Sequence, residues 1–149
     1  MQESEMVNKG IEYFRNQQFI QVQREVPFLS RCIDVVLLNK ENYLISIEFK
    51  VSKWRHAIEQ AKNHKLGADE AYICIPERKL TVELEKAIQE AGVGLFFFNQ
   101  NAERVIYKVI EAPTKYENIP VFKDMLISNI QKINSLFSPP NPSGQTTGR

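Results

Sequence analysis

The chain has 149 residues, a length that suits one domain with a sizeable core. Hydrophobic residues make up 43% and charged residues 25%, which is ordinary for a globular protein. A formal net charge of +1 excludes binding to nucleic acid through overall charge, so any such affinity must come from a local patch.

Two further features indicate the compartment. No apolar run reaches the roughly 18 residues of a membrane span, and the polar, acidic start of the chain is unlike a signal peptide. Cys32 and Cys74 lack the CxxC spacing of metal or redox sites, and both fall in predicted buried strands. We therefore expect reduced core thiols and a cytoplasmic protein.

The first half of the chain predicts one helix followed by three strands. Apolar residues recur at helical spacing near the N-terminus, and the following segments alternate apolar and polar side chains. The predicted elements are a helix over Glu3–Asn16 and strands over Ile20–Phe28, Arg31–Leu38 and Tyr43–Val51. The polar turn at 39–42 joins the last two strands, so we expect them to form a hairpin.

The second half predicts alternating helices and strands. They are helices over Ser52–Lys65, Leu80–Ala91 and Pro120–Phe137, and strands over Ala71–Ile75, Val93–Phe98 and Arg104–Ile110. The strand-helix-strand unit from Ala71 to Phe98 is expected to be a right-handed parallel crossover. The whole predicts a single mixed α/β domain over 1–137, with a central sheet flanked by helices, and a disordered tail over 138–149.

Three charged residues stand out on the second and third predicted strands. Asp34 lies in the middle of an apolar strand, where an unpaired carboxylate is costly to bury. Glu48 and Lys50 are two residues apart, so they emerge from one face of the next strand. We expect that face not to be core, because apolar residues fill the other parity. Adjacent strands lie about 5 Å apart, so Asp34 and Glu48 are able to share one Mg²⁺ through carboxylate oxygens.

The alternative is structural. Asp34 and Lys50 then form a salt bridge while Glu48 faces solvent. In the catalytic interpretation, a metal-bound water is the nucleophile and Lys50 orients that water or offsets charge on the transition state.

The segment from about Gln23 to Pro76 resembles the PD-(D/E)XK nuclease superfamily, which has the restriction-endonuclease-like fold. The matching motifs are ID at 33–34, IEFK at 47–50 and the helix WRHAIEQA at 54–61. Ile33 stands where the motif has proline, a position at which many members carry a hydrophobic residue. The resemblance implies an α-β-β-β-α-β core with extra C-terminal strand and helix elements, Asp34 and Glu48 as metal ligands, and Lys50 as the catalytic lysine.

The predicted helix after Lys50 adds a second layer. By the same resemblance, Gln60 reaches the active site from this helix. The segment from Lys50 to Lys65 contains five lysine and arginine residues and one glutamate. This local surplus of positive charge suits binding to a phosphate backbone. The candidate DNA-binding residues are Lys53, Arg55, His56 and Lys62, and the alternative is an ordinary solvated helix face.

Some related nucleases take a further acid from the first helix. Glu12 is the candidate here, with Glu5 behind it and Glu25 on the first strand as a third option. The apolar stripe of the last predicted helix is compatible either with covering the sheet or with forming a homodimer.

These features predict a nuclease that depends on Mg²⁺, with Mn²⁺ as a substitute, and cleaves phosphodiester bonds in DNA. RNA is not excluded as a substrate, and the chain does not decide between endo- and exonuclease action. One compact domain favours structure-selective or nonspecific cleavage. The alternative is a catalytically inactive module that binds DNA or a protein partner.

Overall fold

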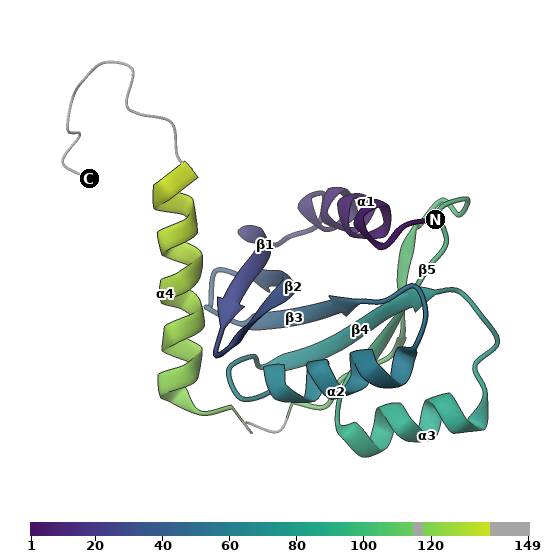
Figure 1. Ribbon diagram of the computed structural model, residues 1–149. Helices are drawn as coiled ribbons and strands as arrows, with labels where there is room; N and C mark the ends of the chain where they lie inside the picture. The colour runs from purple at the N-terminus through teal and green to yellow at the C-terminus, as the bar shows by residue number, and fades with distance from the viewer. Residues whose placement is uncertain (115–117, 138–149) are drawn as a thin grey trace.

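The computed structural model describes residues 1–114 and 118–137. In chain order, the elements alternate as the sequence predicts, with one helix, three strands, then helices between further strands (Figure 1). They are α1 (Glu3–Arg15), β1 (Gln21–Phe28), β2 (Arg31–Leu38), β3 (Leu44–Phe49), α2 (Trp54–His64), β4 (Glu70–Pro76), α3 (Val82–Ala91), β5 (Gly94–Phe98), β6 (Ile106–Ile110) and α4 (Pro120–Phe137).

The strands form one six-stranded mixed sheet in the sequential order β1-β2-β3-β4-β5-β6. The first three strands pair antiparallel, β3 pairs parallel with β4 and β4 pairs parallel with β5, and β6 returns antiparallel. The predicted β2–β3 hairpin and the parallel crossover through α3 are both confirmed. The two parallel connections run through α2 and α3, as parallel strands require a crossover.

One face of the sheet packs against α1. The buried stripe of this helix is Met6, Val7, Gly10, Ile11 and Phe14. It meets the side chains of the central strands in one apolar cluster that includes Val35, Ile47, Phe49, Tyr72 and Phe96. A helix over this face explains why the alternate residues of β2 and β3 are apolar.

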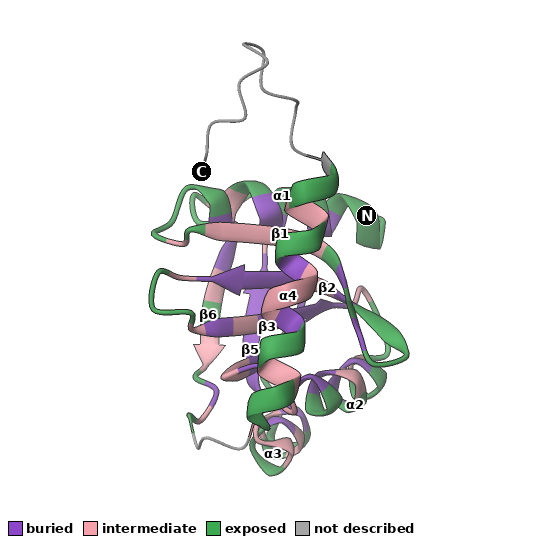
Figure 2. Cartoon of the chain, turned by 90° about the vertical axis from the view of Figure 1, so that its left-hand side faces the viewer, coloured by how far each residue is buried: buried purple, intermediate pink, exposed green. Residues whose placement is uncertain are grey.

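The opposite face is covered by three helices. α2 and α3 lie on β4 and β5, while α4 lies across β1 and β2, where Leu126 and Ile130 pack among Val26, Phe28 and Ile33 (Figures 1 and 2). The buried residues of α4 therefore cover the sheet of their own chain. The homodimer remains a prediction.

The predicted tail at 138–149 lies outside the residues that the structure describes.

Local signals fix the ends of α3 but not those of α2. Thr81 caps α3 by accepting a hydrogen bond from Leu84 N–H at 3.1 Å, and Gly92 ends it in the left-handed conformation with φ of 68°. The sequence predicts that this helix starts at Ser52, but α2 starts at Trp54 and Lys53 occupies its N-cap position, in the left-handed region with φ of 57° and without a side-chain cap bond. The Lys53 side chain therefore does not cap the backbone N–H groups at the start of α2.

Two predictions about burial are wrong. Cys32 is exposed because it lies near the turn of the β1–β2 hairpin, while Cys74 is buried as predicted. The Glu48 face of β3 is not open, since Leu44, Ser46 and Glu48 are all buried. β3 is a central strand with helices over both faces, so both parities of its residues are enclosed. No helix in residues 1–114 and 118–137 has the length and hydropathy of a membrane span.

Candidate active site

The site lies where β2 and β3 separate. The β2–β3 ladder runs from Leu38 paired with Leu44 as far as Val35 paired with Ile47. The next residue of β2 is Asp34. Its side-chain Oδ2, rather than a backbone carbonyl of β2, accepts the hydrogen bond from Phe49 N–H, at 2.8 Å. The strands open at this point, and the opening places the Asp34 carboxylate beside the end of β3.

Glu48 lies opposite Asp34 in this opening. Its side chain is only 5% exposed, and its Oε1 has no hydrogen-bond partner among the described residues. Buried polar atoms are nearly always paired, so an unpaired carboxylate oxygen here requires an explanation. A bound cation is one, because a carboxylate oxygen is the ligand that hard cations prefer.

The two carboxyl groups perturb each other. Burial raises the pKa of Glu48 to about 8, and the adjacent negative charge of Asp34 adds to the effect. Burial also raises the pKa of Asp34, although the hydrogen bond from Phe49 N–H opposes that rise. Two like charges in one partly desolvated site disfavour double ionisation. Without a cation, the pair therefore holds a proton near neutral pH.

Lys50 completes the group. Strand β3 ends at Phe49, so Lys50 stands one residue past it rather than inside it, held by a hydrogen bond from its N–H to the Cys74 carbonyl at 3.0 Å. Its positive charge lowers the pKa of both Asp34 and Glu48, but less than burial raises each of them. The structure thus brings the three residues of the predicted motif together.

The donor set fits a Mg²⁺ ion with few protein ligands. No group of three or more histidine, cysteine, aspartate or glutamate side chains in the described ranges is arranged to hold a metal. Mg²⁺ usually keeps several waters and takes only one or two carboxylates from a protein. Asp34 and Glu48 are two such carboxylates, and one Glu48 oxygen has no partner among the described residues.

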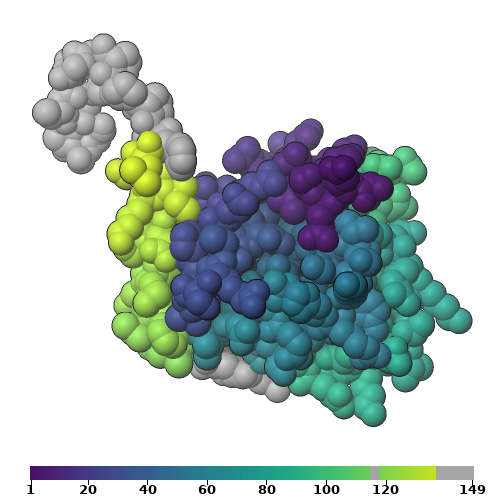
Figure 3. All heavy atoms as spheres, in the orientation of Figure 1, coloured from purple at the N-terminus to yellow at the C-terminus, as the bar shows by residue number. Residues whose placement is uncertain are grey.

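A third acid near the pair is Glu3, which the sequence did not single out. Its Oε2 accepts a hydrogen bond from Val51 N–H at 3.2 Å, and its charge contributes to the raised pKa of Asp34. The first turn of α1 lies against the segment that follows β3 (Figure 3). Acidic residues are favoured in any first helical turn, so this signal carried no functional information before α1 was placed.

Glu12, the predicted acid of this helix, is elsewhere. It lines a groove with Arg15 and Arg24, between α1 and β1. Glu12 is nine positions after Glu3, which is about 14 Å along an α-helix. Glu25 is exposed on the outer strand β1.

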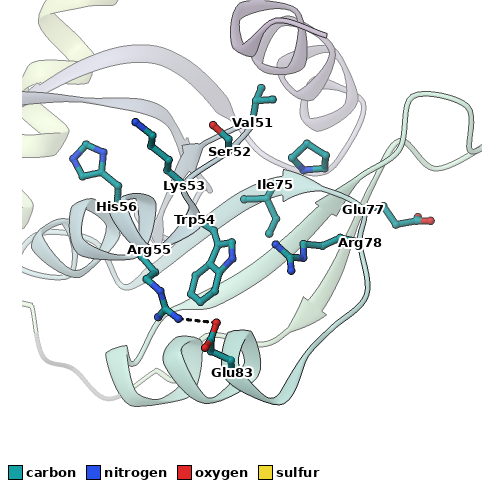
Figure 4. Close-up of a pocket in the computed structure, with 11 residues that line it drawn as sticks. Val51, Ser52, Lys53, Trp54, Arg55, His56, Ile75, Glu77, Arg78 and Glu83 are labelled. Carbon is teal, nitrogen blue, oxygen red and sulfur yellow. Dashed lines mark ion pairs between the residues drawn. The ribbon is translucent and has the colours of Figure 1, made fainter.

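The predicted basic residues of α2 divide between two surfaces. Lys53, Arg55 and His56 line a pocket of about 730 Å³ at the start of the helix (Figure 4). Lys62 faces α3 instead and pairs with Glu59 at 3.6 Å. Arg55 is also paired, with Glu83 at 2.7 Å. The cationic strip predicted along the helix is therefore concentrated at its first turn.

Gln60 and His64 lie deeper on α2, against the turn between β1 and β2. Together with Cys32 they line a small cavity of about 90 Å³, and Cys32 is two residues from Asp34 along β2. Gln60 Oε1 and His64 Nδ1 have no partner within the described part of the chain. His64 is only 5% exposed, and burial lowers its pKa to about 4.

No protein-family model and no curated protein matches the chain. Among solved structures, a protein of unknown function from Silicibacter pomeroyi, SPO1766, is similar over 100% of this chain and 99% of its own, with a TM-score of 0.61 and 18% identity. A repair endonuclease from Pyrococcus abyssi is similar over 76% of this chain, with a TM-score of 0.51 and 21% identity. The match spans about half of that endonuclease, 48%. The chain has a restriction-endonuclease-like fold.

Proposed function

We propose that this protein is a Mg²⁺-dependent nuclease that hydrolyses phosphodiester bonds in DNA by structure-selective or nonspecific cleavage. The observation that carries the proposal is the buried Asp34–Glu48 pair, with an unpaired Glu48 oxygen and the Lys50 ammonium beside it. Such a pair is unfavourable by itself and becomes favourable when a divalent cation binds. Two adjacent buried carboxyl groups destabilise a protein that binds no cation, so stability alone does not explain why Asp34 and Glu48 lie together.

The proposed roles follow from the positions of the residues. Asp34 and Glu48 would hold the ion, and Mg²⁺ supplies a Lewis acid and activates a water when it is bound. Lys50 offsets negative charge on the phosphoryl oxygens as the bond is broken. Glu3 ties the backbone of Val51 to α1, which positions the residue next to Lys50. By the family resemblance, we keep Gln60 of α2 as a residue that positions the strand.

Two further observations support the proposal. The fold is shared with a structure described as a repair endonuclease, at 21% identity. The basic residues Lys53 and His56 are exposed at the start of α2, three and six residues after Lys50, where a phosphate backbone would approach. The two free thiols, Cys32 and Cys74, favour a reducing compartment, so we propose the cytoplasm as its location.

The test is cleavage of plasmid, single-stranded and branched DNA with Mg²⁺ or Mn²⁺. We expect activity from the wild type, loss on chelation, and loss in Asp34→Ala and Lys50→Ala. Lys132→Ala on α4 is the matched control for removing a surface charge, because Lys132 is exposed and α4 packs on β1 and β2 rather than at the end of β3. Cleavage that is unchanged in both site variants would refute the assignment.

Calorimetry with Mn²⁺ separates the nuclease from an inactive module. A nuclease should bind the ion, and Glu48→Gln should abolish that binding. Salt-sensitive DNA binding in a protein that does not bind the ion would favour the module instead.

A further inference from the structure

The pocket at the start of α2 adjoins the candidate active site. It lies at the carboxyl ends of β3 and β4, and its floor includes Val51, which follows Lys50 directly, and Ile75. Ile73 pairs with Glu48 in the β3–β4 ladder. Ile75 is therefore about 7 Å farther along β4 than the level of Glu48. The pocket therefore lies beyond the end of β3 that carries Glu48.

An indole ring forms one wall of this pocket. Trp54 is half-buried, and the Arg55 guanidinium lies over its ring at 4.4 Å from the centroid. Arg55 is held in turn by Glu83 at 2.7 Å. Figure 4 shows the Trp54 ring, Ile75 and the Arg78 guanidinium directed into one space. The Trp54 ring thus forms part of the pocket wall together with Ile75 and Arg78.

The pocket carries uncompensated positive charge. Lys53 and Arg78 form no ion pair within the described part of the chain, whereas Arg55 and Glu83 neutralise each other. The remaining acid, Glu77, points away from the pocket in Figure 4. Its Oε1 accepts hydrogen bonds from the Tyr107 hydroxyl at 2.6 Å and from Asn99 Nδ2 at 3.3 Å.

We infer that this pocket binds one unpaired nucleotide of the strand next to the bond that is cleaved. The inference rests on the proposed function. A nucleobase stacks on the Trp54 ring, and its phosphate pairs with the Arg78 guanidinium that enters the same space. Stacking on an aromatic side chain is sequence-tolerant and requires a free base face, which a base inside a duplex does not offer. The volume of about 730 Å³ is ample for one nucleotide. The substrate is therefore DNA with an unpaired segment at the cleavage site.

Trp54 is the only tryptophan of the chain, so its fluorescence reports on the pocket directly. The wild type is titrated in EDTA, where no cleavage occurs, with a short oligothymidylate, with a blunt duplex and with free thymidine monophosphate. We expect the oligothymidylate to quench the fluorescence in a salt-dependent way, and the duplex and the free nucleotide to do so only at much higher concentration.

Two substitutions refine the test. Arg78→Ala should weaken oligothymidylate binding about tenfold, whereas Lys132→Ala, which removes an exposed charge from α4, should not. Trp54→Ala removes the fluorophore, so it is measured by the anisotropy of a labelled oligonucleotide, with an expected weakening on the order of tenfold or more. Circular dichroism verifies that the variants are folded.

The inference is overturned if the oligothymidylate does not quench Trp54, or if duplex or free nucleotide quenches as well as the oligonucleotide. Equal effects of Arg78→Ala and Lys132→Ala also overturn it. Because the titration needs no metal, its result is separate from that of the cleavage assay. Selective quenching in a protein that does not cleave DNA supports nucleotide binding in the pocket and refutes the proposed nuclease activity. Cleavage without quenching supports the nuclease activity and refutes nucleotide binding in the pocket.

Discussion

Replacing Glu48 with glutamine should stabilise the metal-free protein near neutral pH and remove its response to Mg²⁺. Glutamine keeps the size of the side chain and donates a hydrogen bond toward Asp34, as a protonated Glu48 does, but it does not ionise. The wild-type carboxyl group is ionised in the unfolded chain at pH 7 and must take up a proton to fit the buried site. That proton uptake opposes folding.

The size of the effect follows from the pKa shift. The pKa of Glu48 is about 8 in the folded protein against an ordinary value of 4.5. The stability that this group contributes is fully present below pH 4.5 and is lost as pH rises toward 8. Between pH 4.5 and pH 7 the free energy of unfolding falls by about 1.36 kcal/mol per pH unit, which amounts to about 3 kcal/mol at pH 7. The advantage of Glu48→Gln over the wild type should therefore be about 3 kcal/mol at pH 7 and vanish near pH 4.

Urea unfolding followed by Trp54 fluorescence measures this difference in EDTA at several pH values. Glu12→Gln, which changes an exposed acid on α1, is the matched control and should differ little from the wild type at any pH. Adding Mg²⁺ should stabilise the wild type and leave Glu48→Gln unchanged, because ligand binding stabilises only the state that binds. A Glu48→Gln protein that is less stable than the wild type in EDTA at pH 7 would refute the reasoning.

Three further results are expected. Lys50→Ala should lower turnover at saturating Mg²⁺ by about a hundredfold while calorimetry still detects the ion, and a parallel loss of ion binding would contradict its role in catalysis. Glu3→Gln should weaken Mg²⁺ binding about fivefold, since it removes one nearby negative charge, whereas Glu12→Gln should leave the affinity unchanged; equal affinities in the two variants would count against Glu3. His64 has a pKa lowered to about 4 by burial, so the stability it contributes is present above its ordinary value of 6.5 and is lost as pH falls toward 4. The difference in unfolding free energy between the wild type and His64→Leu should shrink by up to about 3 kcal/mol over that interval, and a difference that does not vary with pH would exclude a buried neutral histidine.

The order of elements was accessible from the sequence because periodicity and turn residues are local properties. The β2–β3 hairpin, the helix ended by Gly92 and the parallel strands around α3 all follow from spacing within short windows. Strand parity also placed Glu48 and Lys50 on one side of the chain. It failed to show that Glu48 is buried, because burial depends on which helices cover the strand.

The acid of the first helix illustrates the same limit. The sequence does not distinguish Glu3, Glu5 and Glu12 as candidates for an acid near the site. Only the packing of α1 on the sheet brings Glu3 close to Val51 and Asp34. The pocket at the start of α2 was missed for a related reason. Arg78 follows β4 and Trp54 follows β3, and these strands are adjacent only because the crossover through α2 makes them parallel neighbours.

The sequence by itself determined the alternation of helices and strands and the residue types of the site, since local hydrophobic patterns and the chemistry of aspartate, glutamate and lysine need no partner to be recognised. Only the tertiary structure decided that β2 and β3 separate at Asp34, that Glu48 is left with an unpaired oxygen, and that Glu3 is the nearby acid. These features arise from contacts between residues far apart in the chain. Burial and the field of neighbouring charges are set by those contacts and not by local sequence.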